Sequence, residues 1–213
     1  MTGLQPERSG KRAFSAMRGD DVGRSHFLET ALALIKRGLS VVPMWPVGDG
    51  RPLVCRCAWH ACPGACTHAM GAPIDEPAVA RDVWQHRPDA GVAVSTGGEG
   101  RLWVLAVDGQ RGARNLAELA DVHLERLPGG PMTVTGPEQI RYWMRAPQHL
   151  RGTRSMRIRA GVRLLAAGDL VLAPPSPTPA GHFCRWAGPS TGGELPDAPA
   201  WLVSGAERRR LAL

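Results

Sequence analysis

The apolar segments of this chain change character near its middle, and that change constrains the fold more than any other feature of the sequence. In the first half, segments with helical periodicity alternate with short apolar strands, whereas the second half holds strand-like segments separated by turns. This order is typical of an α+β or α/β domain, and we expect an α+β fold with a mixed sheet and flanking helices. The expected helices are 25–38, 76–86 and 113–126, and the expected strands are 39–43, 90–94, 102–107, 132–134, 140–144, 162–165, 170–173 and 182–186.

The two ends of the chain are basic and lack apolar periodicity. Residues 1–24 are rich in glycine, serine, arginine and aspartate, and we expect a disordered basic tail there. Ser25 is a suitable N-cap for the first helix, and the folded domain is predicted to span residues 25–204. After a closing turn or short helix at 199–203, residues 205–213 are expected to form a second basic tail.

Neither a membrane span nor a secretory signal is indicated by the sequence. No apolar run reaches the about 18 residues that a transmembrane helix needs, and residues 1–24 lack the apolar stretch of a signal peptide. We therefore expect a cytoplasmic protein without a membrane partner.

The formal net charge of +7 favours nucleic acid as a partner, because phosphates attract such a surface. Nearly all of the positive charge comes from arginine, since Lys11 and Lys36 are the only lysines. Alanine, glycine, proline and arginine are abundant together, as in proteins from GC-rich genomes, so codon bias is an alternative source of the charge.

A loop rich in cysteine, at residues 51–70, predicts a structural zinc site. Zinc takes four nitrogen or sulfur ligands, and short spacings between thiolates close such a site at little entropic cost. The favoured ligands are Cys55, Cys57 and Cys62, with His68 or Cys66 as the fourth, and the alternative is a few buried or incidental cysteines. Cys184 stands apart in an apolar strand and is expected to be a buried structural thiol. The candidate ligands are Cys55, Cys57, Cys62, Cys66 and His68.

A series of short motifs follows in a fixed order along the chain. The motifs are Arg37-Gly38, Val41-Val42-Pro43, Arg51-Pro52, Trp84, Gly91-Val92-Ala93-Val94-Ser95-Thr96-Gly97, Val107-Asp108, Ala173-Pro174-Pro175-Ser176, Gly181-His182-Phe183 and Trp186. Their order and spacing resemble the N-terminal domain of bifunctional DNA primase-polymerases, in the archaeo-eukaryotic primase superfamily, over roughly residues 27–202. The resemblance implies a primase-polymerase architecture with an RRM-like core.

The same resemblance implies two Mg²⁺ or Mn²⁺ ions held by carboxylates, a histidine that contacts phosphates, and a further aspartate on a later strand. Asp108 is the single acid retained where an Asp-x-Asp is expected, because Ala106 replaces the first. Ile140 stands at the histidine position and Arg163 at the late aspartate. Three such replacements indicate a site that has lost two-metal catalysis.

Three functions remain open at this point. The first is a catalytically impaired primase-polymerase that acts as a DNA- or nucleotide-binding accessory protein, through Arg141, Arg163 and Ser176, with a replication or regulatory protein as a further partner. The second is an active template-dependent enzyme in which Asp108, Glu138 and Asp169 rebuild a metal site. The third is a zinc-stabilised regulatory or protein-interaction module, for which a cleft filled by Trp143 or Arg163 would be evidence.

The tryptophans divide into two groups by context. Trp84, Trp103 and Trp186 lie in helix or strand patterns and are expected in the core, whereas Trp59 lies in the cysteine loop and is expected to be exposed. The glycine turn from Gly97 to Gly100 lacks the lysine that a G-x-x-x-x-G-K-[ST] phosphate loop needs, so the sequence does not indicate a nucleoside triphosphatase.

Overall fold

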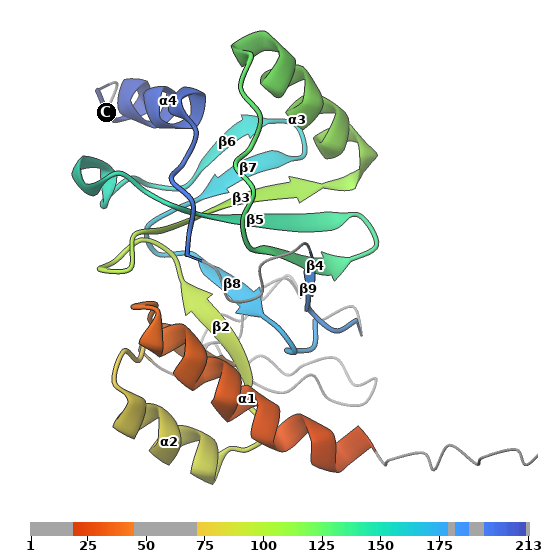
Figure 1. Cartoon of the computed structure of the whole chain (residues 1–213), viewed down its shortest axis with the longest axis vertical. Coiled ribbons are helices and arrows are strands. Elements are labelled where there is room, and N and C mark those ends of the chain that lie inside the picture. Colours follow the sequence, from red (N-terminus) through yellow and green to blue (C-terminus); the bar gives the residue numbers. More distant parts are fainter. Residues whose placement is uncertain (1–18, 45–71, 179–181, 188–193, 212–213) are drawn as a thin grey trace, which may run out of the picture.

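The computed structural model describes residues 19–44, 72–178, 182–187 and 194–211. Two antiparallel sheets and four α-helices make up this part of the chain. Figure 1 shows the larger sheet with α3 and α4 at one end of the molecule, and the smaller sheet with α1 and α2 at the other. In order, the helices and strands are α1 Gly19–Lys36, β1 Val41–Met44, α2 Pro77–His86, β2 Gly91–Ser95, β3 Leu102–Asp108, α3 Gly109–His123, β4 Met132–Gly136, β5 Gln139–Arg145, the 3-10 turn Gln148–Leu150, β6 Met156–Arg159, β7 Val162–Leu165, β8 Leu170–Ala173, β9 Arg185–Ala187 and α4 Ala200–Leu211.

The strands pair in two separate sheets. The smaller sheet has the order β1-β2-β8, and the larger has the order β6-β7-β3-β5-β4-β9. Every pairing between these strands is antiparallel. The α+β class is confirmed, but the expected mixed sheet is wrong. Hairpins join β4 to β5 and β6 to β7, and such short connections produce antiparallel neighbours.

Strand β3 lies at the centre of the larger sheet and is buried on both faces. Trp103, Leu105 and Val107 pack on the same side as residues of α3 and α4. The alternate residues of the strand pack on the other side, toward the smaller sheet and α1. Because side chains alternate along a strand, the continuous apolar sequence of β3 supplies one row to each core.

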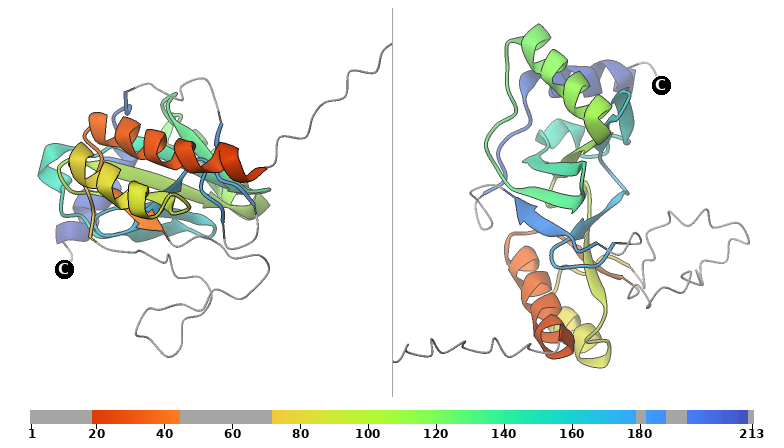
Figure 2. Two further views of the ribbon diagram at one scale, coloured as in Figure 1. Left: turned by 90° about the horizontal axis from the view of Figure 1, so that it is seen from below. Right: turned by 90° about the vertical axis from the view of Figure 1, so that its right-hand side faces the viewer.

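Helices α1 and α2 lie side by side against the smaller sheet, away from α3 and α4 (Figure 2). The first helix buries Phe27, Ala31 and Leu34 on one side, at the i, i+4 and i+7 spacing of a helix face. Trp84 of α2 is 2% exposed, and its indole N–H donates a 2.8 Å hydrogen bond to the carbonyl of Ala90. The expected burial of Trp84 is confirmed, as it is for Trp103.

Both ends of the described domain differ from the sequence expectation. Helix α1 begins at Gly19, ahead of the expected start at Ser25. At the other end, the expected basic tail from residue 205 continues as helix α4 to Leu211. Trp201, Leu202 and Ala206 of α4 are buried against the larger sheet, so this packing stabilises a helix whose own sequence has little amphipathic pattern.

One further strand, β6, has no counterpart among the expected elements. Its sequence, Met-Arg-Ile-Arg, is half basic and lies at the edge of the larger sheet, where it pairs with β7 alone. Exposed charged residues are common on edge strands, and they obscure the apolar signal of the strand. None of the helices in the described part of the chain has the length and apolar character to cross a lipid bilayer.

Candidate functional site

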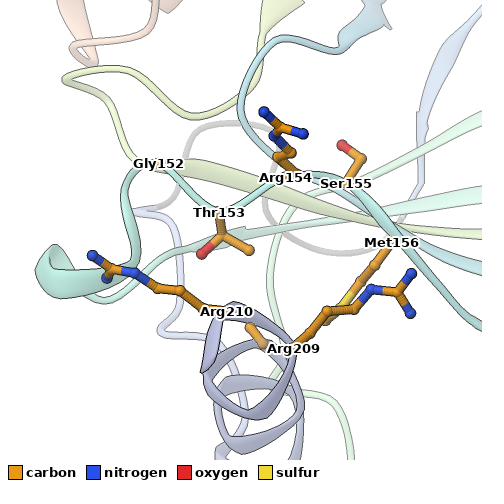
Figure 3. Close-up of a pocket in the computed structure, with 8 residues that line it drawn as sticks. Gly152, Thr153, Arg154, Ser155, Met156, Arg209 and Arg210 are labelled. Carbon is orange, nitrogen blue, oxygen red and sulfur yellow. The ribbon is translucent and has the colours of Figure 1, made fainter. Parts of the chain in front are cut away.

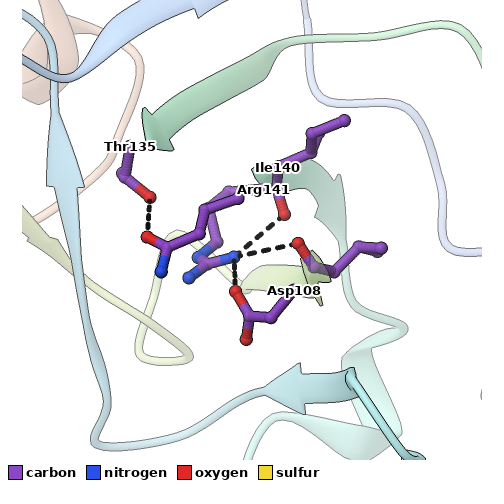
Figure 4. A network of polar contacts seen from close by, with 6 residues as sticks. Asp108, Thr135, Ile140 and Arg141 are labelled. Atoms are coloured by element: carbon purple, nitrogen blue, oxygen red, sulfur yellow. Dashed lines mark hydrogen bonds and ion pairs between the residues drawn. The ribbon is translucent and has the colours of Figure 1, made fainter. Parts of the chain in front are cut away.

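An ion pair between Asp108 and Arg141 lies where β3 ends. Arg141 Nη1 is 2.7 Å from Asp108 Oδ1, and the same nitrogen donates to the carbonyls of Ile140 at 3.1 Å and Val107 at 3.4 Å (Figure 4). The arginine side chain is 16% exposed and the aspartate side chain is 40% exposed. The guanidinium is therefore fixed by three oxygens, one of which is the carboxylate that the resemblance assigns to metal binding.

Ala106 lies between two arginines on neighbouring strands. It pairs directly with Arg141 of β5 on one side and with Arg163 of β7 on the other. Directly opposed residues of antiparallel strands project from the same face, so both arginines share the face of Ala106 and Asp108. The row continues outward to Arg157 of β6 beside Arg163 and to Thr133 of β4 beside Arg141.

This face of the sheet looks toward the smaller sheet rather than toward α3 and α4. Leu102, Val104 and Ala106 pack with apolar residues of β2, β8 and α1 in a single core. The candidate site therefore lies between the two halves of the domain, at the end of their shared core. Arg163 is exposed there, and it makes no ion pair with any acid in the described residues.

Ile140 projects away from this site. It pairs with Val107 of β3 and Val134 of β4, and these residues occupy the alternate positions of their strands. Since successive residues of a strand point to opposite faces, Ile140 lies on the face of α3 and Arg141 on the face of Asp108. The β5 residue that meets the retained acid is thus Arg141, one position after the expected one.

The three acids considered for a rebuilt metal site do not converge. Glu138 lies near the end of β3, since its carbonyl accepts a 2.8 Å hydrogen bond from Gly109 N and its carboxylate accepts one of 3.2 Å from Gln110. Asp169 lies near the other end of β3, where the strand begins. Its carbonyl accepts a 2.9 Å hydrogen bond from Thr96 N, and the next residue, Gly97, donates from its N–H to the carbonyl of Leu102, the first residue of β3. The strand between these ends is about 20 Å long.

A buried polar cluster lies behind Arg141. Thr133 is fully buried and its hydroxyl accepts a 3.1 Å hydrogen bond from Trp143 Nε1. Burial raises the pKa of the Cys184 thiol to about 12, against the opposing effects of a hydrogen bond with Thr133 and the charge of Arg141. Trp143 also contacts Trp186, with ring centroids 5.2 Å apart. Trp143 is 1% exposed, so it fills the core behind the site.

Ser176 belongs to the scaffold rather than to this site. Its side chain is fully buried, its hydroxyl donates to Val92 O at 2.8 Å, and it accepts from Val92 N at 2.7 Å. A Cβ atom at Gly91 would lie 3.3 Å from the serine, so the glycine permits this close approach. The expected contact of Ser176 with a nucleotide or DNA is not supported, because both hydrogen-bonding functions of the hydroxyl are used.

The candidate zinc ligands Cys55, Cys57, Cys62, Cys66 and His68 lie outside the described residues, as does Trp59. The zinc site therefore stays a prediction from the sequence. Within the residues that the structure describes, no group of three His, Cys, Asp or Glu side chains could hold a metal ion.

The residues around Asp108 do not fit a pair of divalent cations. Only one carboxylate faces this part of the sheet from β3, and the guanidinium of Arg141 occupies one of its oxygens. Arg163 adds a second positive charge across Ala106. A cation at this position would meet repulsion from both arginines, whereas a phosphate would meet donors that match its oxygens.

A family model described as "Bifunctional DNA primase/polymerase, N-terminal" matches residues 31–201 of the chain. The match extends from α1 to the beginning of α4 and includes both sheets. No curated protein matches the chain.

Proposed function

The chain belongs to the family of bifunctional DNA primase/polymerase N-terminal domains, and from this membership we propose that it is a catalytically impaired member that binds DNA or a nucleotide as an accessory protein. The fold is retained across both sheets, so the loss concerns the site and not the scaffold. The ligand would be held by arginine contacts with phosphate oxygens in place of metal ions.

The observation that carries this proposal is the ion pair between Arg141 and Asp108. A carboxylate that binds Mg²⁺ offers its oxygens to the metal, but Asp108 Oδ1 receives a hydrogen bond of 2.7 Å from a guanidinium. Two hydrogen bonds to main-chain carbonyls hold the same guanidinium nitrogen in place. Displacing it would leave a positive charge that is mostly buried without its partner.

Arg163 supports the binding half of the proposal. Its side chain is exposed on the same face as the ion pair and has no acidic partner among the described residues. A guanidinium carries five N–H donors in a planar fork that matches two phosphate oxygens. A phosphate bound there would replace an unfavourable accumulation of positive charge with a charge-assisted hydrogen bond.

An assay of nucleotide incorporation tests whether the protein has lost polymerase and primase activity. Purified protein would be incubated with Mg²⁺ and then with Mn²⁺, on primed and unprimed single-stranded templates, beside an Asp108→Ala variant that exposes a contaminating polymerase. We expect no synthesis by either protein. Template-dependent synthesis by the wild type that disappears in Asp108→Ala would refute the proposal and identify an active primase-polymerase.

Titration of a labelled nucleoside triphosphate and a labelled oligonucleotide tests the binding half. Arg163→Ala is expected to weaken binding, because it removes an unpaired guanidinium from the site. Arg159→Ala is the matched control: Arg159 lies on the adjacent edge strand, but it is already paired with Glu118 at 3.1 Å. Equal affinities of the two variants would show that the site does not bind phosphate.

A further inference from the structure

A second group of arginines surrounds a pocket away from Asp108. The pocket has a volume of about 470 Å³ and lies between the segment that leads into β6 and the last turns of α4 (Figure 3). Three of its lining residues are Arg154, Arg209 and Arg210. Two segments that are distant in the sequence thus both contribute arginine residues to the lining of one cavity.

The positive charge of this pocket is largely uncompensated. The side chains of Arg154 and Arg209 are exposed and form no ion pair or hydrogen bond within the described residues, while the Arg210 side chain donates to the carbonyl of His149. The neighbouring acids have other partners, since Glu207 is 2.8 Å from His149 Nε2 and Asp169 accepts a hydrogen bond from Ser155. Anions are therefore favoured in the pocket.

Thr153 adds an independent indication of a ligand. The residue lines the pocket and is 9% exposed, yet its hydroxyl has no hydrogen-bond partner among the described residues. Its main-chain groups are satisfied, because its N–H donates to Leu150 O at 3.0 Å and its carbonyl accepts from Ala167 N at 3.0 Å. Buried hydroxyls without a partner are rare, and a phosphate oxygen in the pocket would accept its hydrogen bond.

Further arginines lie beside the pocket, on the other face of the same sheet edge. Arg154 lies just before the edge strand β6, and Arg157 of that strand pairs directly with Arg163 of β7. Arg163 in turn pairs with Ala106. Arg157 and Arg163 therefore share the face of Ala106, whereas the pocket lies on the face that packs against α4. A nucleic-acid strand that passes around the edge strand can contact arginines on both faces, whereas an isolated anion contacts only one of the two positions.

We propose that the pocket between residues 152–156 and α4 binds the phosphodiester backbone of single-stranded nucleic acid, as an anchoring site separate from the residues around Asp108. The phosphate groups would be contacted by Arg154, Arg209 and Arg210, and the Thr153 hydroxyl would donate a hydrogen bond to one of them. Such contacts carry no sequence information, so binding through this pocket is independent of base sequence.

Fluorescence anisotropy with a labelled oligothymidylate tests this anchoring site. The double variant Arg154→Ala/Arg209→Ala is expected to raise the Kd by about tenfold or more at low salt, and to reduce the slope of log K against log salt by about 1–2. Both residues are exposed, so a thermal melt should show an unchanged fold. The control Arg159→Ala removes one charge that is already paired with Glu118.

Two comparisons separate this inference from the proposed function. If Arg163→Ala weakens binding while the double variant binds like the wild type, the anchoring site is refuted and the proposed function stands. If the double variant loses only its binding of pyrophosphate, measured by calorimetry, the pocket takes free phosphates and the nucleic-acid assignment is wrong. A wild type that binds neither oligonucleotide nor nucleotide would refute both.

Discussion

Arg141 of β5 donates to Asp108 of β3 across the larger sheet, at 2.7 Å, and the same Arg141 nitrogen also donates to two main-chain carbonyls beside the aspartate. The arginine side chain is mostly buried, so its charge depends on this one carboxylate. The pair therefore contributes to the stability of the sheet as well as to the character of the candidate site.

Replacing Arg141 by methionine should destabilise the fold. We expect Arg141→Met to lower the free energy of unfolding by about 1–2 kcal/mol, because it removes a charge-assisted hydrogen bond in a partly buried position. Urea unfolding measures the change. Arg159→Met, which breaks a more exposed pair with Glu118, should cost at most about 0.5 kcal/mol. Equal costs for the two variants would show that the Asp108 pair is not stabilising.

Removal of the Ser176 hydroxyl should affect stability but not ligand binding. Ser176→Ala leaves the buried N–H and carbonyl of Val92 without their partner, and we expect a loss of about 2–4 kcal/mol in the free energy of unfolding. Thr135→Ala, which removes one exposed hydrogen bond to Gln139, is the matched control and should cost about 0.5 kcal/mol or less. Ser176→Ala should leave the oligonucleotide affinity unchanged below the melting temperature. A specific loss of affinity would show that Ser176 takes part in ligand binding.

Two adjacent glycines offer a direct test of the packing at the β2–β3 turn. Both have positive φ, +75° at Gly97 and +61° at Gly98. A Cβ at Gly97 would lie 2.7 Å from the Cα of Ala167, whereas a Cβ at Gly98 meets nothing within 4 Å. We expect Gly98→Ala to cost about 1 kcal/mol from the backbone alone, and Gly97→Ala to cost about 2–3 kcal/mol. Thermal unfolding of the two variants gives the difference, and equal melting temperatures would contradict the close approach.

Cys184 should be unreactive in the folded protein at pH 8, because burial raises its pKa to about 12. Iodoacetamide labelling followed by peptide mass spectrometry should leave Cys184 unmodified until the protein unfolds. The raised pKa also has a consequence for stability. The folded state keeps the proton between pH 9 and 12 while the unfolded thiol ionises, so this contribution is complete below pH 9 and is lost as the pH rises toward 12. Labelling of Cys184 in the native protein at pH 8 would contradict this prediction.

The cysteine loop predicts one bound zinc per chain. Metal analysis of the purified protein should find zinc near one equivalent, and Cys57→Ser should lose it because the site needs four donors. Cys184→Ala is the matched control, since this thiol lies far along the chain from the loop and should not be a ligand. A protein purified without zinc, and unable to bind it when zinc is added, would show that the clustered thiols are incidental.

Local patterns in the sequence were sufficient to predict most of the secondary structure. Strands 162–165 and 170–173 have the expected bounds, and Trp84 and Trp103 are buried as expected. The order of short motifs was sufficient for the family, which the match over residues 31–201 confirms. These features depend on residues close together in the chain, where apolar periodicity and turn residues act directly.

The tertiary structure decided the chemical environment of those residues, because strand register is set by pairing between distant segments. A shift of one residue along β5 would exchange Ile140 for Arg141 beside Asp108, and no local pattern distinguishes these two registers. Packing against the larger sheet likewise stabilises α4 where a basic tail was expected from the sequence. The same packing places Arg209 beside the pocket that Arg154 also lines. Retention of Asp108 could be predicted from the sequence, but its ion pair depended on the folded sheet, which places Arg141 opposite Ala106 and on the same face as Asp108.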